Sequence, residues 1–198
     1  VYKRQVHDIY RHWRQIFNEY DPPRVAVAEA WVPANRRPPY ATREELGQAF
    51  NFDLLQAPFR AEELRRIIDD NLALAARSGS STTWVLSNHD VVRHATRYGL
   101  PEELRDGREY VLGDGHTVAC DADLGLRRAL AATLLILALP GSTYLYQGEE
   151  LGLPQVVDIA DEYRQDPTFF RSPGVDKGRD GCRVPLPWTP DGPSLGFG

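Results

Sequence analysis

Short apolar runs alternate with segments of helical period along most of the chain. Apolar side chains recur every three or four residues over residues 6–17 and 64–72, which predicts amphipathic helices. Between such segments lie apolar runs at residues 25–28, 83–86 and 143–146, each of a length suited to one strand. Alternating helices and strands are typical of parallel β/α units rather than of a sandwich or a helical bundle.

Proline and glycine define the ends of the predicted elements. The first helix is expected to end before residues 21–23 (DPP), and a second is predicted over residues 60–78, where Gly79 can adopt a left-handed cap. A third helix is predicted over residues 124–139, and a further short strand over residues 50–55.

Two stretches have no persistent period and are predicted to be loops. Residues 98–123 contain several glycines, and residues 151–198 are rich in Pro, Gly and Asp. In the second stretch we expect three acidic residues, Asp158, Asp161 and Asp166, to lie in a solvated loop.

Ionisable residues directly follow two of the predicted strands. The predicted strand at residues 25–28 is followed directly by Glu29, and the predicted strand at residues 83–86 is followed directly by residues 87–90 (SNHD). In a parallel α/β barrel, side chains at the carboxyl ends of the strands form the open rim. We therefore predict a single α/β domain over residues 1–198, about half of a (β/α)8 TIM barrel, with Glu29 and Asp90 at a common rim.

Two carboxylates at one rim suit the cleavage of a glycosidic bond. The neighbours of Glu29 are apolar, so we expect its pKa to be raised into the range of a general acid. Asp90 can stabilise oxocarbenium charge, and His89 can donate to a sugar hydroxyl. The alternatives are a rim glutamate in an ordinary salt bridge and a capped turn at residues 88–90.

Composition excludes several other classes. The formal net charge of −5 gives no basic face for nucleic acid. The longest apolar stretch, residues 129–140, is too short to span a membrane and is predicted to be a buried helix. Cys120 and Cys182 are expected to be free thiols, which together with the absence of a signal-like start indicates a cytoplasmic protein. His89 and Asp90 lack the spacing of a zinc site, so no metal site is predicted.

Five segments together resemble the α-amylase superfamily of glycoside hydrolases, in the branch of α-glucosidases and oligo-1,6-glucosidases. In chain order they are residues 25–31 (VAVAEAW), 50–53 (FNFD), 87–93 (SNHDVVR), 140–150 (PGSTYLYQGEE) and 179–188 (RDGCRVPLPW). The resemblance covers essentially the whole chain. It implies about strands 5 to 8 of the barrel, with long βα loops and truncation at both ends.

The resemblance also implies roles for individual residues. Glu29 takes the position of the acid/base, and Asp90 that of the carboxylate that stabilises the transition state. His89 takes the position of the histidine that contacts the sugar in subsite −1. Arg93 is similar to a substrate or gating arginine, and Arg183 to the arginine that holds the non-reducing-end glucose.

The family's nucleophile has no counterpart in this chain. It is an Asp at the end of the fourth strand, whereas this chain starts in the helix that would follow that strand. Asp8 and Asp21 lie on that helix or its terminal turn, so neither is a substitute. We therefore expect an excerpt of a longer protein that is inactive alone, without a cofactor, although calcium is possible in the missing part. The resemblance makes Glu149 and Glu150 structural hydrogen-bonding groups.

The resulting prediction is a retaining α-glucosidase that acts on short α-linked gluco-oligosaccharides, with no nucleic acid or membrane partner. An alternative on the same scaffold is an isomerase or transglycosylase that forms trehalose or isomaltulose. A metal-dependent hydrolase and a non-catalytic, transporter-associated relative are further alternatives. The joint presence of Glu29, His89 and Asp90 argues against the non-catalytic relative.

Overall fold

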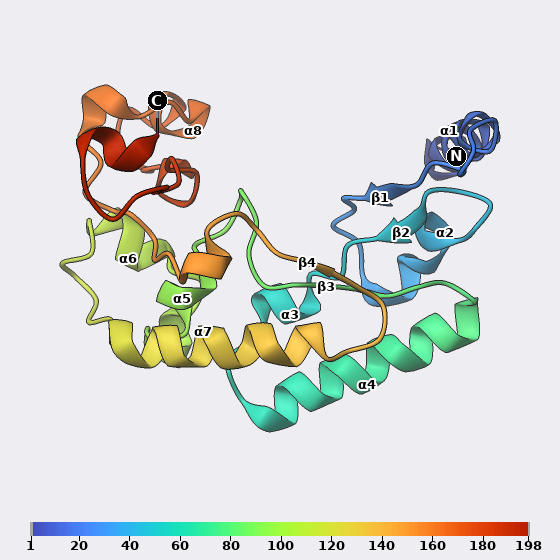
Figure 1. Cartoon of the computed structure of the whole chain (residues 1–198), viewed down its shortest axis with the longest axis horizontal. Coiled ribbons are helices and arrows are strands. Elements are labelled where there is room, and N and C mark those ends of the chain that lie inside the picture. Colours follow the sequence, from blue (N-terminus) through green and yellow to red (C-terminus); the bar gives the residue numbers. More distant parts are fainter. Residues whose placement is uncertain (1, 198) are drawn as a thin grey trace. The chain divides into compact units, whose positions relative to one another are not determined.

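The computed structural model describes residues 2–197, with side chains from Gln5 onward. The chain divides into two compact units. The first, here called the strand unit, comprises Val1–Val85 and Ile136–Tyr144. The second, here called the loop unit, comprises Leu86–Leu135 and Leu145–Gly198. Figure 1 labels the helices and strands of both.

All the strands that the structure describes belong to the strand unit, and they pair in parallel. They are β1 (Ala26–Ala28), β2 (Gly47–Ala49), β3 (Thr83–Val85) and β4 (Ser142–Tyr144). β1 pairs with β2 and β3 pairs with β4. Parallel neighbours need crossover connections, and the helices between the strands provide them, which confirms the predicted β/α alternation.

The two strand pairs are joined through side chains. The fully buried Thr83 hydroxyl donates to the carbonyl oxygen of Ala49 at 2.8 Å and accepts the amide of Asn51 at 2.9 Å. A second link runs from the Tyr144 hydroxyl to Gln48 Oε1 at 2.6 Å. β2 and β3 are therefore side by side, and the four strands keep their chain order in space.

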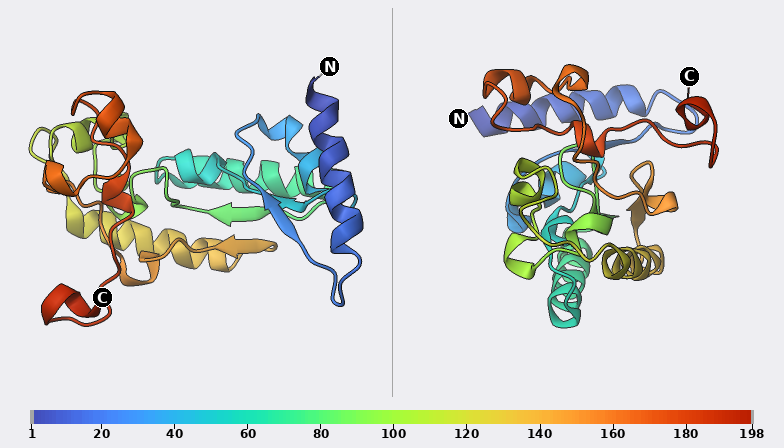
Figure 2. Two further views of the ribbon diagram at one scale, coloured as in Figure 1. Left: turned by 90° about the horizontal axis from the view of Figure 1, so that it is seen from above. Right: turned by 90° about the vertical axis from the view of Figure 1, so that its left-hand side faces the viewer.

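Four helices belong to the strand unit: α1 (Tyr2–Phe17), α2 (Pro38–Ala41), α3 (Asp53–Gln56) and α4 (Ala61–Ser78). α4 matches the predicted helix and ends at Gly79, whose φ of +64° is the expected left-handed cap. α1 lies beside α2 and the start of β2 (Figures 1 and 2), because Arg14 donates to the carbonyl oxygens of Glu45 and Leu46.

The strand predicted over residues 50–55 is wrong. The strand lies earlier, at β2, and the chain then enters helix α3. The side chain of Asn51 accepts the amide of Asp53 at 3.0 Å, which closes a turn two residues ahead. Asp53 in turn accepts Nη2 of Arg37 at 3.1 Å, so this polar segment starts a helix instead of extending a strand.

The helices of the loop unit are short except for α7. They are α5 (His94–Arg97), α6 (Arg108–Leu112), α8 (Pro167–Arg171) and α7 (Ala122–Leu137), which ends in the strand unit. Short 3-10 segments are found in the strand unit at Ala34–Arg36 and in the loop unit at Glu102–Leu104, Glu149–Leu151, Asp161–Tyr163, Asp180–Cys182 and Pro193–Gly196. The stretch predicted as loop over residues 98–123 therefore contains α6, and the stretch after residue 151 contains α8.

The prediction of a buried helix over residues 129–140 is only partly right. On α7 the residues Ala132 and Ile136 are each 1% exposed, whereas Leu134 is 70% exposed. The apolar face of α1 is similarly open, with Ile9 50% and Trp13 45% exposed. None of the helices within residues 2–197 has the length and apolar character needed to cross a membrane.

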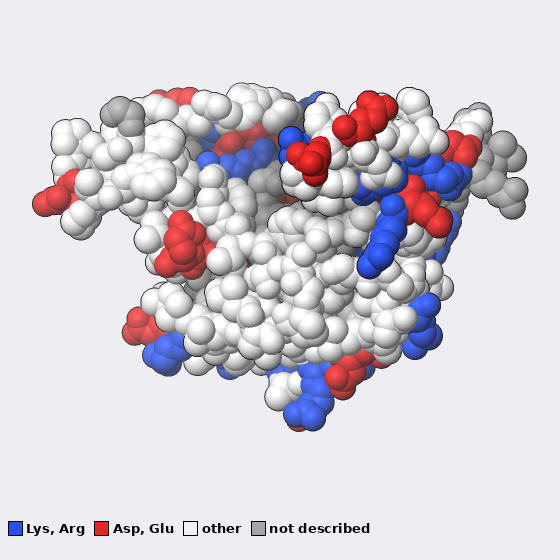
Figure 3. Space-filling view, turned by 45° about the vertical axis from the view of Figure 1, so that its right-hand side comes forward, with Lys and Arg blue, Asp and Glu red and all other residues white. Residues whose placement is uncertain are grey.

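Acidic and basic side chains lie next to one another on the face that Figure 3 shows. On α1, for example, Arg11 pairs with Asp8 and, at 3.0 Å, with Glu45. His7 lies 2.7 Å from the other oxygen of Glu45. Of these pairs, Arg11–Asp8 is exposed, and an exposed pair of this kind contributes at most about 1 kcal/mol, whereas Glu45 is a buried partner.

A buried ionisable pair lies at the start of α5. Nδ1 of His94 is 2.8 Å from the Ser87 hydroxyl and 3.6 Å from Oε1 of Glu149. Burial, reinforced by Arg97, lowers the pKa of His94 to about 3. Burial also raises the pKa of Glu149 to about 7, although Arg93 and Arg97 oppose the shift. Glu149 is thus a buried residue of the loop unit's interior.

We predict that Glu149→Gln stabilises the protein increasingly as the pH rises. A carboxyl whose pKa is about 7 when folded and 4.5 in its reference state binds more protons in the folded state between these values. Its favourable contribution is complete below pH 4.5 and is lost as the pH rises to about 7. The difference in the free energy of unfolding between variant and wild type should grow by about 3 kcal/mol over this range.

Urea unfolding of both proteins at several pH values between 4.5 and 8 measures this difference. His94 is present in both proteins, so its own titration largely cancels from the comparison. Glu103→Gln, at an exposed position of the same unit, is the matched control for the loss of a carboxylate. A difference between wild type and E149Q that is equal at pH 5 and pH 8 would contradict the assignment.

Candidate active site

The segment after β3 carries Asp90 on a turn. Leu86 and Ser87 remain buried as the chain leaves the strand. The side chain of Asn88 then accepts the amide of Asp90 at 2.8 Å, which is the capped turn considered above as an alternative. The turn presents the side chain of His89, which is exposed, and that of Asp90, which is partly exposed. The structural and the functional interpretation of this segment are therefore compatible.

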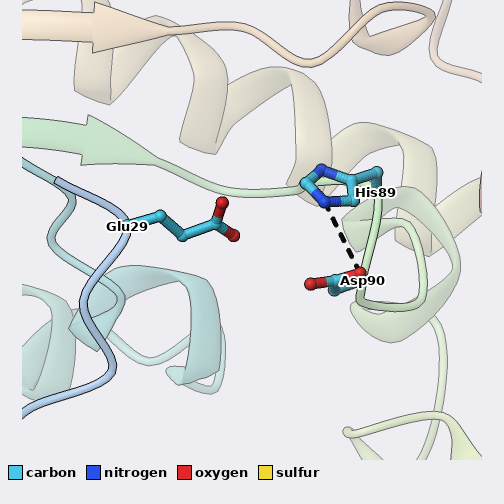
Figure 4. Close-up of side chains that lie close together, drawn as sticks. All are labelled: Glu29, His89 and Asp90. Carbon is cyan, nitrogen blue, oxygen red and sulfur yellow. Dashed lines mark ion pairs between the residues drawn. The ribbon is translucent and has the colours of Figure 1, made fainter. Parts of the chain in front are cut away.

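One oxygen of Asp90 receives two guanidinium groups. Nη1 of Arg179 donates to Oδ1 at 2.6 Å and Nη2 of Arg183 donates to the same atom at 3.0 Å. Nε2 of His89 lies 3.6 Å from Oδ1, the contact that is dashed in Figure 4. Each of these contacts is to Oδ1, so the carboxylate is held through that one oxygen. A carboxylate held in this way is preorganised to stabilise positive charge.

Arg183 also fixes the backbone of the turn. Its Nε donates to the carbonyl oxygen of His89 at 2.7 Å, next to its bond to Asp90. The residue is therefore in the site, bound to both members of the His89-Asp90 pair. The contact with a terminal glucose that the sequence implies for Arg183 stays a prediction.

Arg93 is buried, with 1% of its surface exposed. Its Nη1 donates to the carbonyl oxygen of Gln147 and its Nη2 to that of Cys182, both at 2.9 Å. The guanidinium also lies over the ring of Tyr146 at 4.9 Å. Arg93 thus ties together three segments of the loop unit, and its role toward substrate stays a prediction.

Glu29 directly follows β1 in the strand unit, so its strand-end position is as predicted. Figure 4 labels it on the segment after the strand. Its side chain is exposed, and the nearby Trp31 stacks on Phe52 at a ring separation of 4.1 Å. Its acid/base role and its place at a common rim with Asp90 stay predictions.

The expectation of a solvated loop is wrong for Asp166, which is 1% exposed. Its Oδ1 accepts the amide of Thr168 at 2.9 Å as the N-cap of α8, and its Oδ2 accepts Nε of Arg179 at 2.6 Å. The guanidinium of Arg179 holds the pKa of Asp166 well below its usual range, and Asp166 raises that of Arg179. The sequence carried one signal, because Asp before Pro167 is a typical helix start.

The sequence does not predict a role for Arg179, although it stands in the same short segment as Arg183. The two arginines are four residues apart, and both reach Asp90. Within the loop unit, the positive charge at Asp90 and Asp166 is therefore supplied by arginine. The thiols of Cys120 and Cys182 are free, as predicted.

Known proteins that are similar to this chain include trehalose synthases and alpha-glucosidases. The chain is 29% identical over 209 residues to a trehalose synthase/amylase, TreS, of Mycobacterium tuberculosis, covering 94% of this chain and 31% of that protein. It is 39% identical over 111 residues to a probable alpha-glucosidase of Rhizobium meliloti, covering 55% of this chain and 16% of that protein. The chain thus spans less than a third of the length of either relative.

Solved structures of enzymes are also similar to this chain. The crystal structure of the alpha-glucosyl transfer enzyme XgtA is similar with a TM-score of 0.69 and 32% identity, covering 95% of this chain and 31% of that one. Residues 3–198 match the family model described as the alpha amylase catalytic domain. Together with the parallel strands and the site at Asp90, this match shows that the chain belongs to the α-amylase catalytic-domain family.

Proposed function

We propose that the protein is a retaining α-glucosidase that acts on short α-linked gluco-oligosaccharides, and that this chain forms about strands 5 to 8 of its (β/α)8 barrel. The observation that carries the proposal is the geometry at Asp90. Two guanidinium groups fix one of its oxygens, and the exposed imidazole of His89 lies beside it. Such a group can stabilise a developing oxocarbenium ion while the imidazole donates to a ring hydroxyl.

The proposed reaction is a double displacement in which each carboxyl group has a separate task. A nucleophilic carboxylate, which we place in a segment preceding this chain, forms a bond to the anomeric carbon as the glycosidic C–O bond breaks. Glu29 gives its proton to the leaving oxygen. Water then attacks the same carbon, Glu29 takes a proton from that water, and the nucleophile is released. Asp90 and His89 bind the glucose ring in both steps.

The first test is Glu29→Gln in the full-length protein. Loss of general acid catalysis should lower kcat for maltose by about 10²- to 10⁴-fold, because the alkoxide leaving group needs the proton. A 4-nitrophenolate leaving group needs little protonation, so the burst of nitrophenol from 4-nitrophenyl α-glucoside should be affected much less. Stopped-flow and steady-state kinetics measure the two effects.

Glu44→Gln is the matched control, because Glu44 is exposed in the same unit and lies away from the end of β1. It should retain wild-type kcat on both substrates. Unchanged turnover of maltose by E29Q, or a nitrophenol burst slowed as much as the turnover of maltose, would refute the acid/base assignment.

The second test concerns the 198-residue chain alone. Without the nucleophile no glycosyl-enzyme can form, so we expect no hydrolysis of 4-nitrophenyl α-glucoside above the rate of the buffer. The assay is paired with circular dichroism, which reports whether the helix content expected of the folded chain is present. Detectable hydrolysis by the folded chain would overturn the placement of the nucleophile outside residues 1–198.

A second candidate function is the isomerisation of maltose to trehalose, which the trehalose synthase/amylase relative favours because it matches 94% of this chain. The two reactions differ in whether water or a released sugar attacks the glycosyl-enzyme. We expect glucose as the only product from maltose, measured by chromatography over the time course. Trehalose accumulating faster than glucose would favour the isomerase instead.

A further inference from the structure

A buried carboxylate lies one guanidinium away from Asp90. Nε and Nη2 of Arg179 donate to the two oxygens of Asp166, at 2.6 and 3.3 Å, while Nη1 of the same group donates to Asp90 at 2.6 Å. The planar guanidinium therefore binds Asp166 with one edge and reaches Asp90 with another. The guanidinium of Arg179 thus binds both carboxylates directly.

The two carboxylates that Arg179 bridges differ in environment. The side chain of Asp166 has none of its surface exposed, whereas those of Arg179 and Asp90 are 39% and 28% exposed. A buried carboxylate is stable only with its hydrogen bonds complete. Asp166 completes them with the amides of Thr168 and Arg179 in addition to the guanidinium. Asp166 is therefore the fixed end, and Asp90 is the end that a ligand can reach.

The backbone around Asp166 is fixed as well. The side chain of Asp180 accepts the amides of Gln165 and Asp166, both at 3.0 Å. Asp166 accepts the amide of Arg179 at 2.9 Å, so two adjacent segments bind each other reciprocally. Gly178 has a φ of +68°, and a Cβ there would lie 2.7 Å from Cβ of Asp166. The close approach of the two segments is thus built into the sequence at this glycine.

We propose that Asp166 is a positioning residue of the active site, which holds the guanidinium of Arg179 in the orientation that fixes Asp90. This inference rests on the proposed function and goes beyond it, because Asp166 contacts neither Asp90 nor the ring that Asp90 would bind. A long flexible arginine without this anchor would sample several rotamers. With it, Nη1 of Arg179 is in place before the substrate arrives.

The test is Asp166→Asn in the full-length protein. Asn keeps an oxygen for the amide of Thr168 but loses the charge and one acceptor for Arg179. We expect kcat to fall on the order of 10- to 100-fold, as for displacement of a catalytic group by about 1 Å. Asp161→Asn is the matched control, because Asp161 pairs with Arg164 and Lys177 in the same segment and should leave kcat unchanged.

A double-mutant cycle separates positioning from general support of the fold. If Asp166 acts through Arg179, D166N should change kcat by less than about twofold in an R179A background. If Asp166 only supports α8, its loss should multiply that of R179A. Wild-type kcat in D166N, or a fully multiplicative loss, would overturn the proposal.

Two further outcomes are distinguishable. If D166N does not fold, Arg179→Lys replaces it, because an ammonium can neutralise Asp166 but cannot bridge it to Asp90. A folded R179K protein with wild-type kcat would overturn the proposal. Failure of the proposed function itself would show separately, as an E29Q protein with unchanged turnover.

Discussion

In the strand unit, one buried hydroxyl joins β2 to β3. At the carboxyl end of β2, the carbonyl of Ala49 and the amide of Asn51 receive no backbone partner from β3, and the Thr83 side chain serves both. A buried carbonyl and amide without partners would each cost about 1–3 kcal/mol. Because a hydroxyl donates and accepts at once, Thr fits this position and an isosteric Val does not. The register of β2 against β3 therefore follows from the chemistry of one side chain.

In the loop unit, the backbone carbonyls of long irregular segments need hydrogen-bond donors that no helix or strand supplies. Three buried arginines supply the donors. Arg93 binds the carbonyls of Gln147 and Cys182, Arg97 donates to that of Leu86 at 2.6 Å, and Arg164 donates to that of Lys177 at 3.1 Å. A guanidinium is suited to this task because it presents five donors in one rigid plane. Segments that are predicted to be loops from the sequence are therefore held at defined positions by these hydrogen bonds.

What the sequence predicted follows from local physics. Periodicity located α4, and Gly79 marked its end, because both depend on neighbouring residues alone. The strand misplaced to residues 50–55 shows the limit, since the turn at Asn51 is fixed by a hydrogen bond to Thr83, which is distant in sequence. Leu134, which is 70% exposed, shows a second limit of prediction from sequence. Hydropathy indicates that a side chain prefers burial, but it does not indicate which part of the protein covers it.

The candidate site divides in the same way. Asp90 and His89 could be proposed as site residues from the sequence because they follow a strand and match a known pattern. Asp166 could not, because an acidic residue in a stretch rich in Pro, Gly and Asp looks solvated until its partner is known. That partner, Arg179, is 13 residues away and is brought back by a glycine with positive φ. Residues that support a site through a buried contact carry almost no local signal.

The pairing of a buried and a partly exposed carboxylate on one arginine has a physical rationale. A buried ion pair is seldom a net source of stability, because desolvation offsets much of the Coulombic gain. Its effect here is geometric, because Asp166 restricts the rotamers of Arg179. The entropy of the side chain is therefore lost when the protein folds and not when the reaction proceeds. Electrostatic stabilisation of a transition state is largest when the charges need not reorganise as the reaction proceeds. In this protein the immobile charge is Asp166, and through Arg179 it holds Asp90 in place.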